Sequence, residues 1–212
     1  MKLNIGCGAS PVPGWVNVDN SMSLYLAKHS IIDYLLRKMG LLNAQQIKLI
    51  DFFKQNDVLY SKATHLPIKE NSVSIVYSSH MMEHLDRQDA FIFLHEVMRV
   101  LIDGGVLRLC LPDIHKLCKN YLDHGDADIF VEQTLLATPP QKSFSNKLKF
   151  FIIGHRHHMW MYDAKSLARI LLKVGFRKIR VLEAGETGLL NDEEGINFFE
   201  HCDHSFYIEA VK

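Results

Sequence analysis

Short apolar runs alternate with segments of helical periodicity along the chain, which is the pattern of a layered α/β domain. Because helical segments separate the early runs, we expect a mostly parallel sheet wound on both faces by helices. The last two runs have no helical pattern between them and favour an antiparallel pair. The seven predicted strands are residues 3–5, 15–18, 58–60, 73–77, 106–111, 176–182 and 205–211.

Apolar residues recur every three or four positions in the segments between the strands. From Leu24 to Gln55 this pattern is interrupted once, at Gly40, so we predict two helices in this crossover. A later helix is expected to follow Asp163 as its N-cap and to stop at Gly175. The other predicted helices are residues 88–101, ended by Gly104 and Gly105, and residues 114–122 and 129–136.

Charge is balanced, with 24 Lys and Arg residues against 24 Asp and Glu residues, and no long basic run is present. This argues against a nucleic-acid partner, whose phosphates would require many cations. Twelve histidines are an unusually high number for 212 residues. The length suits one domain over residues 1–212. Four scattered cysteines and the lack of a long apolar run predict a soluble, cytoplasmic protein.

The loop after the first strand is the first candidate binding site, because ligands of such sheets lie beyond the carboxyl ends of the strands. Gly6 and Gly8 would let the backbone approach a ligand closely. Pro11 stands where a dinucleotide-binding loop has its third glycine, and no phosphate-loop ending is present. Asp19 could accept two hydrogen bonds from a ribose diol. Alternatively, the glycines form an ordinary turn and Asp19 caps the next helix.

Five segments, in order, resemble motifs of class I S-adenosylmethionine-dependent methyltransferases of the type-11 group. They are 3–8 (LNIGCG) with 14–19 (GWVNVD), 66–72 (LPIKENS), 77–85 (YSSHMMEHL), 96–105 (EVMRVLIDGG) and 108–113 (RLCLPD). A looser match, 155–163 (HRHHMWMYD), is similar to methyltransferases linked to sugar or surface-polysaccharide pathways. The resemblance implies a Rossmann-like, doubly wound sheet of seven strands with an antiparallel last strand, a helical insertion at about 20–56 and an acceptor-side lid at about 123–163.

The resemblance also implies a cofactor, S-adenosyl-L-methionine, and an acceptor that is a small molecule or a glycan. The positions that it marks as cofactor-binding are Asn4, Gly6, Cys7, Gly8, Asp19, Ala63, Thr64, Ser78, Ser79 and His80. The sequence departs from the family at residues 61–64, where an acid is usual, and at Ser74, which replaces an aspartate. Backbone groups at Ala63 and Thr64 could contact the adenine in place of the missing acid. The departures also motivate an alternative function, a catalytically silent binding or partner subunit.

Methyl transfer from a sulfonium is an in-line displacement, so much of the catalysis can come from positioning the acceptor. His80 is the first candidate for a base or an acceptor-orienting residue, or else it hydrogen-bonds a loop backbone. Asp113 could orient an acceptor hydroxyl or cap the next helix. His157, with its neighbours His155 and His158, is expected to line an acceptor pocket. If histidine acts in catalysis, acceptor turnover should fall below about pH 6.

Glu83 and His84 raise the question of a metal site beside His80. We expect instead that Glu83 and His84 cap a helix and pack the loop, and that the protein needs no metal. A zinc site among the later histidines would require a fourth ligand that the sequence does not place. Residues 147–153, which are basic and then apolar, are expected to form a lid on the core. Contact of this segment with a membrane or a lipid-linked acceptor is the alternative. The oligomeric state is left open.

Overall fold

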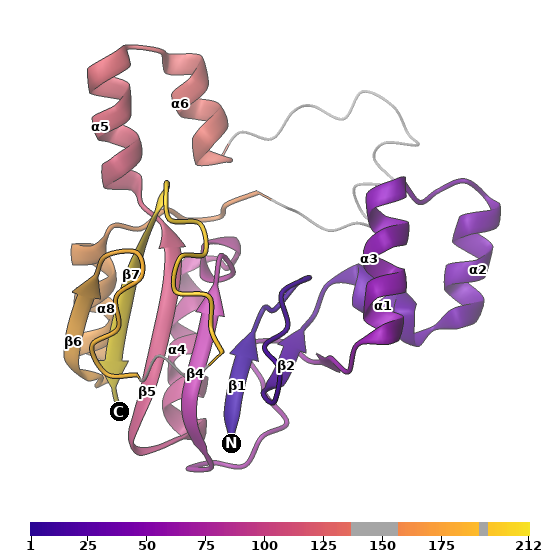
Figure 1. Ribbon diagram of the computed structural model, residues 1–212, viewed down its shortest axis with the longest axis horizontal. Helices are drawn as coiled ribbons and strands as arrows, with labels where there is room; N and C mark the ends of the chain where they lie inside the picture. The colour runs from indigo at the N-terminus through magenta and orange to yellow at the C-terminus, as the bar shows by residue number, and fades with distance from the viewer. Residues whose placement is uncertain (137–156, 191–194) are drawn as a thin grey trace.

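The computed structural model describes residues 1–136, 157–190 and 195–212 (Figure 1). Seven strands form one sheet in the order β3-β2-β1-β4-β5-β7-β6. Neighbouring strands from β3 to β5 are parallel, whereas β7 runs antiparallel to both β5 and β6. The predicted mostly parallel sheet with an antiparallel last strand is therefore confirmed. The strands are β1 (Lys2–Ile5), β2 (Val16–Asp19), β3 (Leu59–Tyr60), β4 (Val73–Ser79), β5 (Leu101–Pro112), β6 (Arg177–Leu182) and β7 (Ser205–Val211).

Helices surround this sheet in three groups. Helices α4 and α8 lie behind it, α1 to α3 stand beside the β1 and β2 edge, and α5 and α6 form an arm beyond the carboxyl end of β5 (Figure 1). On the other face, Leu190 and Ile196, from the chain between β6 and β7, pack with Trp15 and Tyr77. The helices are α1 (Met22–Lys28), α2 (Ser30–Lys38), α3 (Ala44–Gln55), η1 (Met82–His84), α4 (Arg87–Val100), α5 (Ile114–His124), α6 (Ala127–Thr134) and α8 (Ala164–Val174).

The largest apolar core lies between the central strands and the helices α4 and α8. Leu3 of β1, Val76 of β4 and Leu109 of β5 are buried there with Phe93 of α4 and Leu171 of α8. Each such side chain stabilises the fold by roughly 1.5–3 kcal/mol when it leaves water. The central strands are buried on both faces, which explains why their sequences are nearly continuous apolar runs.

The ends of α8 follow the sequence signals closely. Asp163 caps the helix by accepting a hydrogen bond from the Ser166 N–H at 2.6 Å, and the Ser166 hydroxyl bonds back to the Asp163 N–H. Gly175 ends the helix in the left-handed region, with φ 114°. Both predicted termini of this helix are confirmed.

The crossover between β2 and β3 contains three helices, so the prediction of two was wrong. The extra break lies at His29, which leaves the helical conformation with φ −125° and ψ 74°. The periodic apolar residues before Gly40, which include Ile32, Leu35 and Met39, are largely exposed, with Leu35 48% and Met39 60% accessible. The buried residue of α2 is instead Asp33, because the chain turns at His29 and places this helix on the outside of α1 and α3.

The glycine pair after α4 acts differently from the prediction. The helix ends at Val100, and β5 already begins at Leu101, before the glycines. Gly104 adopts φ 80°, and a Cβ atom on Gly105 would lie 2.9 Å from the carbonyl oxygen of Ile102. The pair therefore shapes an irregular first part of β5, where the register with β4 also shifts.

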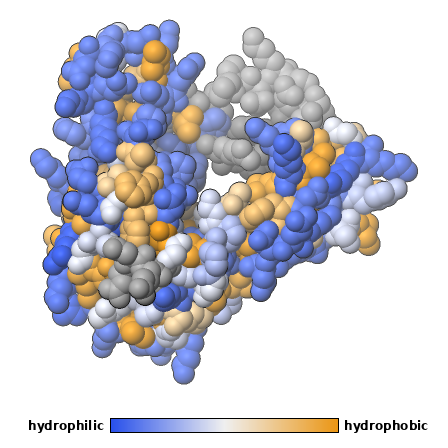
Figure 2. All heavy atoms as spheres, in the orientation of Figure 1, coloured by the Kyte–Doolittle hydropathy of each residue, from blue (hydrophilic) through white to orange (hydrophobic). Residues whose placement is uncertain are grey.

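The expected acceptor-side lid is described only in part. Residues 137–156, which include His155 and the segment 147–153, lie outside the described residues. The arm of α5 and α6 is mostly hydrophilic on the face seen in Figure 2. Among the described residues, no helix combines the length and the apolar character that a membrane crossing needs.

Candidate functional site

The loop after β1 is held by backbone hydrogen bonds to the end of β2. The Gly6 N–H donates to the Val18 carbonyl at 2.8 Å, and the Gly8 N–H donates to Asp19 Oδ2 at 3.0 Å. Both glycines lie in the left-handed region, which favours residues without a Cβ atom. A Cβ atom on Gly6 would lie 2.4 Å from Met81 Cγ, whereas nothing lies within 4 Å of one on Gly8. The loop thus packs tightly at Gly6 and presents open backbone at Gly8.

A cavity of about 230 Å³ opens at the carboxyl ends of β1, β2 and β3. Asp19 forms part of its wall and is only 8% exposed. Its carboxylate also accepts the Ser21 N–H at 2.6 Å, whereas Ser21 itself caps α1. Asp19 therefore joins two loops at the cavity and does not cap the helix. The lining residues are Ile5, Gly6, Asp19, Asn20, Ser61, Lys62, Ala63, Thr64, Met81, Leu85 and Asp89.

The segment after β3 completes the cavity with Ala63 and Thr64, as the position of the motif suggested. The Ser61 N–H donates to the Asp19 carbonyl at 3.1 Å, which fixes this segment beside β2. Asp89, in the first turn of α4, also lines the cavity. Segment 61–64 of the cavity wall has no carboxylate, and Asp89 supplies one to the same cavity. Asp89 was not predicted from the sequence, because only the fold brings the first turn of α4 to the same cavity as the segment after β3.

Of the residues that the resemblance marked as cofactor-binding, six do not line the cavity: Asn4, Cys7, Gly8, Ser78, Ser79 and His80. The side chains of Asn4, Cys7 and Ser78 have partners within the protein. Asn4 Nδ2 donates to Asn17 Oδ1 at 3.0 Å, and the Ser78 hydroxyl donates to the Ile5 carbonyl at 2.8 Å. Cys7 is buried, and burial raises the pKa of its thiol to about 12, with a further contribution from the nearby carboxylate of β2. These side chains support the loop from behind, and only their backbone could face a ligand.

The E-x-x-R segment of α4 holds the residues that follow the cavity wall. Glu96 Oε1 accepts the Leu66 N–H at 2.7 Å. Arg99 donates to the carbonyls of Leu66 at 3.1 Å and Ile68 at 2.9 Å, and it also pairs with Glu96. Two of the sequence motifs are therefore joined in space, and their shared task is to position the chain after Thr64.

His80 lies at the end of β4 in a left-handed conformation, with φ 47°, which is unusual for a residue that is not glycine. Its N–H donates to the Cys110 carbonyl at 2.9 Å, and its ring Nε2 lies 2.7 Å from the Ser205 hydroxyl. Burial, together with His201 and His158, lowers the pKa of His80 to about 3. His80 therefore stays neutral at pH 6, so an expected loss of turnover there cannot be assigned to it. Ser79, also marked as cofactor-binding, precedes His80 and is not among the residues that line the cavity.

Glu83 is buried in η1, with 1% of its surface exposed, and burial raises its pKa to about 8. Its Oε1 lies 3.6 Å from His80 Nδ1 and 3.9 Å from His158 Nε2. His84 Nδ1 donates to the His157 carbonyl at 3.0 Å, so the backbone of His157 takes part in this group. Asp86, rather than Glu83 or His84, caps α4, so the predicted capping role was wrong.

Asp113 ends β5 and begins α5. Its carboxylate accepts the His115 N–H at 2.9 Å, and its own N–H donates to the His204 carbonyl at 2.9 Å. Two roles were considered for Asp113, and the structure shows one of them: Asp113 is the N-cap of α5. The residue nevertheless lies at the same carboxyl edge of the sheet as His80.

Known proteins share this architecture. The family model described as a methyltransferase domain matches residues 3–109, half of the chain. A SAM-dependent methyltransferase from Thermotoga maritima is similar in structure, with a TM-score of 0.55, 16% identity, and coverage of 100% of this chain and 82% of the other. One from Methanosarcina mazei gives a TM-score of 0.52 and 17% identity over 100% of this chain and 91% of the other. No curated protein sequence matches the chain.

The cavity itself fits an adenosyl ligand. Asp19 offers a carboxylate at the end of β2, and Gly6, Ala63 and Thr64 line the same cavity. The strand order places this cavity at the point where the chain reverses direction across the sheet, next to β1 and β4. Together with the family match, these features assign the chain to the class I S-adenosylmethionine-dependent methyltransferases, with S-adenosylmethionine as its cofactor.

Proposed function

We propose that the protein transfers a methyl group to a small-molecule or glycan acceptor by in-line displacement. The observation that carries this proposal is the position of Met81. It lines the cavity with Gly6, whereas its neighbours His80 and Glu83 do not line the cavity and lie close to each other, with 3.6 Å between His80 Nδ1 and Glu83 Oε1. An adenosyl ligand and an acceptor could therefore meet across one turn of the chain at the end of β4.

For the cofactor, we propose that Asp19 holds the ribose hydroxyls, that the backbone at Gly6 and Gly8 passes beneath the methionine, and that Ala63 and Thr64 contact the adenine. S-adenosylmethionine would supply the electrophilic methyl group. The buried position of Asp19 strengthens its hydrogen bonds, because water does not compete for the carboxylate.

For the acceptor, we propose that His80 orients a hydroxyl or amine through a hydrogen bond to its neutral ring; a pKa this low makes the ring too weak a base to take the proton. The lowered pKa keeps the ring neutral, and the hydrogen bond with Ser205 fixes its orientation. Asp113 and His157 are proposed to complete the acceptor side at the same edge of the sheet. The balanced charge of the chain supports a small or uncharged acceptor over a nucleic acid.

A link to sugar or polysaccharide pathways is supported by the resemblance of residues 155–163. Within this stretch Trp160 is 45% exposed, and the Arg87 guanidinium lies over its ring at 4.7 Å. An exposed, braced indole is a flat apolar surface on which the carbon face of a sugar can stack. All four cysteines are free thiols, which supports a reducing compartment such as the cytoplasm.

The alternative is a binding or partner subunit without turnover. It is favoured by the absence of an acid in residues 61–64 and of the aspartate replaced by Ser74. Such a protein would still bind the cofactor but would not transfer its methyl group.

Labelled S-adenosylmethionine would test the proposal with the full chain. The protein is incubated with the methyl-labelled compound and a low-molecular-mass or glycan fraction of a cell extract, and labelled products are separated by chromatography. We expect label in an acceptor with the native chain and none with Asp19→Asn. Binding of S-adenosylhomocysteine without any labelled product would instead support the silent subunit.

A further inference from the structure

Glu83 is a buried acid whose position is not explained by hydrogen bonds to its carboxylate. Neither carboxylate oxygen has a hydrogen-bond partner within the described ranges 1–136, 157–190 and 195–212. The residue is firmly held, because its carbonyl accepts the Met159 N–H at 2.7 Å and the Trp160 N–H at 3.2 Å. A buried carboxylate that is neither hydrogen-bonded nor paired destabilises a fold unless it is neutral or binds a cation.

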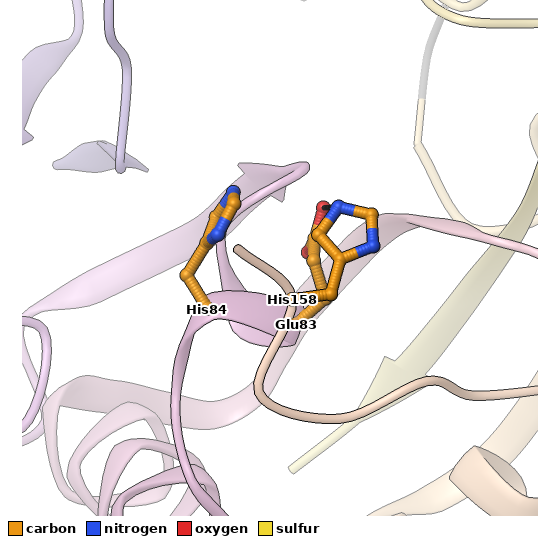
Figure 3. A group of neighbouring side chains, drawn as sticks. All are labelled: Glu83, His84 and His158. Carbon is orange, nitrogen blue, oxygen red and sulfur yellow. Dashed lines mark ion pairs between the residues drawn. The ribbon is translucent and has the colours of Figure 1, made fainter. Parts of the chain in front are cut away.

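Histidines surround this carboxylate. Figure 3 shows Glu83 and His84 leaving η1 beside His158, which comes from the segment before α8. One ligand atom from each of the three residues can be chosen so that all three lie within 4.8 Å of one another. His80 Nδ1 also lies near this carboxylate, 3.6 Å from Glu83 Oε1. His84 is exposed, so an ion could reach the group from solvent.

The rings of both histidines are already oriented by hydrogen bonds. His84 Nδ1 donates to the His157 carbonyl, which can only accept, so the proton of the neutral ring lies on Nδ1. His158 Nδ1 lies 3.1 Å from the Met161 thioether sulfur, and its Nε2 is the nitrogen nearer to Glu83. Fixing the second ring nitrogen in this way is the usual support for a metal-bound histidine.

We propose that Glu83, His84 and His158 bind one divalent transition-metal ion of the Zn²⁺ type. Two imidazoles and one carboxylate are the donors that such ions prefer, whereas Mg²⁺ and Ca²⁺ favour oxygen ligands. In a tetrahedral zinc site the ligand atoms lie roughly 3.3 Å apart, so the three side chains would draw somewhat closer on binding. This proposal departs from the expectation, drawn from the sequence, that no metal is bound.

Three protein ligands leave a fourth position open. We assign that position to an acceptor oxygen or to water, because His80, the residue proposed to orient the acceptor, lies 3.6 Å from the Glu83 carboxylate. This role rests on the proposed function, whereas binding of the ion does not.

Competition with a chromophoric chelator tests the site in the full chain. The protein is stripped with EDTA, desalted and titrated with Zn²⁺, and the uptake per chain is measured. We expect one tight Zn²⁺ per native chain, unchanged by excess Mg²⁺. His84→Gln should weaken it by at least about 10-fold, as loss of metal-site support does. Because His84 is exposed, this variant should fold.

His95→Gln is the matched control, since His95 is an exposed histidine on α4 outside the group. It should bind Zn²⁺ like the native chain. Glu83→Gln, which keeps the shape of the side chain, is a second variant and should also lose the tight site. Failure of the native chain to take up Zn²⁺, or equal binding by the native chain, His84→Gln and Glu83→Gln, would overturn the proposal.

Calorimetric titration of S-adenosylhomocysteine into the same samples separates this proposal from the proposed function. Zn²⁺ failure with retained S-adenosylhomocysteine binding would refute the metal site alone. Tight Zn²⁺ uptake that depends on His84 and Glu83 would support the metal site even if S-adenosylhomocysteine did not bind, a result that would refute the proposed function.

Discussion

Two buried glutamates, Glu83 and Glu209, have opposite surroundings. Glu209 in β7 is fully buried, pairs with Arg108 Nη1 at 2.6 Å, and accepts the N–H groups of Gly188 at 3.0 Å and Leu189 at 2.7 Å. Glu83 in η1 is almost equally buried, but its carboxylate accepts no hydrogen bond from any described residue. Its neighbours are histidine nitrogens at distances of 3.6 and 3.9 Å.

This difference distinguishes an acid that stabilises the fold, Glu209, from an acid whose carboxylate is available to a ligand, Glu83. The Glu209 carboxylate is satisfied within the protein, and it joins β5, β7 and the chain after β6. The Glu83 carboxyl has no comparable partner among the described residues, so its oxygens are available to the ion that we propose. The variants that follow test this contrast in order of decreasing effect on stability.

Glu209→Gln should be the most destabilising of these changes. It leaves the Arg108 guanidinium buried without its counter-charge, and removal of one partner of a buried pair costs about 3–5 kcal/mol. The free energy of unfolding, from urea titration at pH 7, measures the loss. A loss below about 1 kcal/mol would mean that Glu209 contributes no more to the stability of the fold than Glu83 does.

Asp33→Asn should have an intermediate effect. Burial acts to raise the pKa of Asp33, but hydrogen bonds from Arg37 and Lys54 outweigh it and lower the pKa. Both partners are partly exposed, so we expect a cost of about 1–2 kcal/mol at pH 7. Because the pKa is lowered in the folded state, this contribution is present above the unfolded pKa of about 3.9 and is lost as pH falls through the folded pKa.

The pH dependence of that cost is measured by urea titration of the native chain and of Asp33→Asn at pH 7 and pH 3. Asp103→Asn, at an exposed position, is the control and should change little at either pH. A cost for Asp33→Asn that is as large at pH 3 as at pH 7 would show that the charge of Asp33 is not its source.

Glu83→Gln should change stability least when the protein is free of metal. The substitution removes a buried acid that has no hydrogen bond to lose within the described structure, so we expect a change of less than about 1 kcal/mol in EDTA. Added Zn²⁺ should raise the melting temperature of the native chain and not that of the variant. A loss in EDTA as large as that of Glu209→Gln would remove the contrast between the two acids.

The strands were predictable because local pattern and burial agree in the sheet. The last strand was predicted at its observed bounds, Ser205–Val211, and the first began one residue early, at Lys2. The break at His29 was missed because residues 24–39 carry a helical pattern on both sides of it. Packing on α3, and not local periodicity, decides where α1 ends.

The candidate site was predictable where it depends on one loop and not where distant segments meet. Gly6, Asp19 and Ala63 lie at the cavity as the motifs implied. The group around Glu83 requires His158, which is far away in the sequence, and no local pattern connects the two. Likewise, residues 61–64 gave no sign that Asp89 would face them across the cavity.

Calorimetric titration with S-adenosylhomocysteine tests the central claim, that Asp19 and the cavity beside it hold the cofactor. The native chain and the Asp103→Asn control should bind one molecule per chain with the same affinity. Asp19→Asn should bind about 100-fold more weakly, because two charge-assisted hydrogen bonds together contribute about 3 kcal/mol. No binding by the native chain at millimolar ligand, or equal affinity in the native chain and Asp19→Asn, would contradict the account.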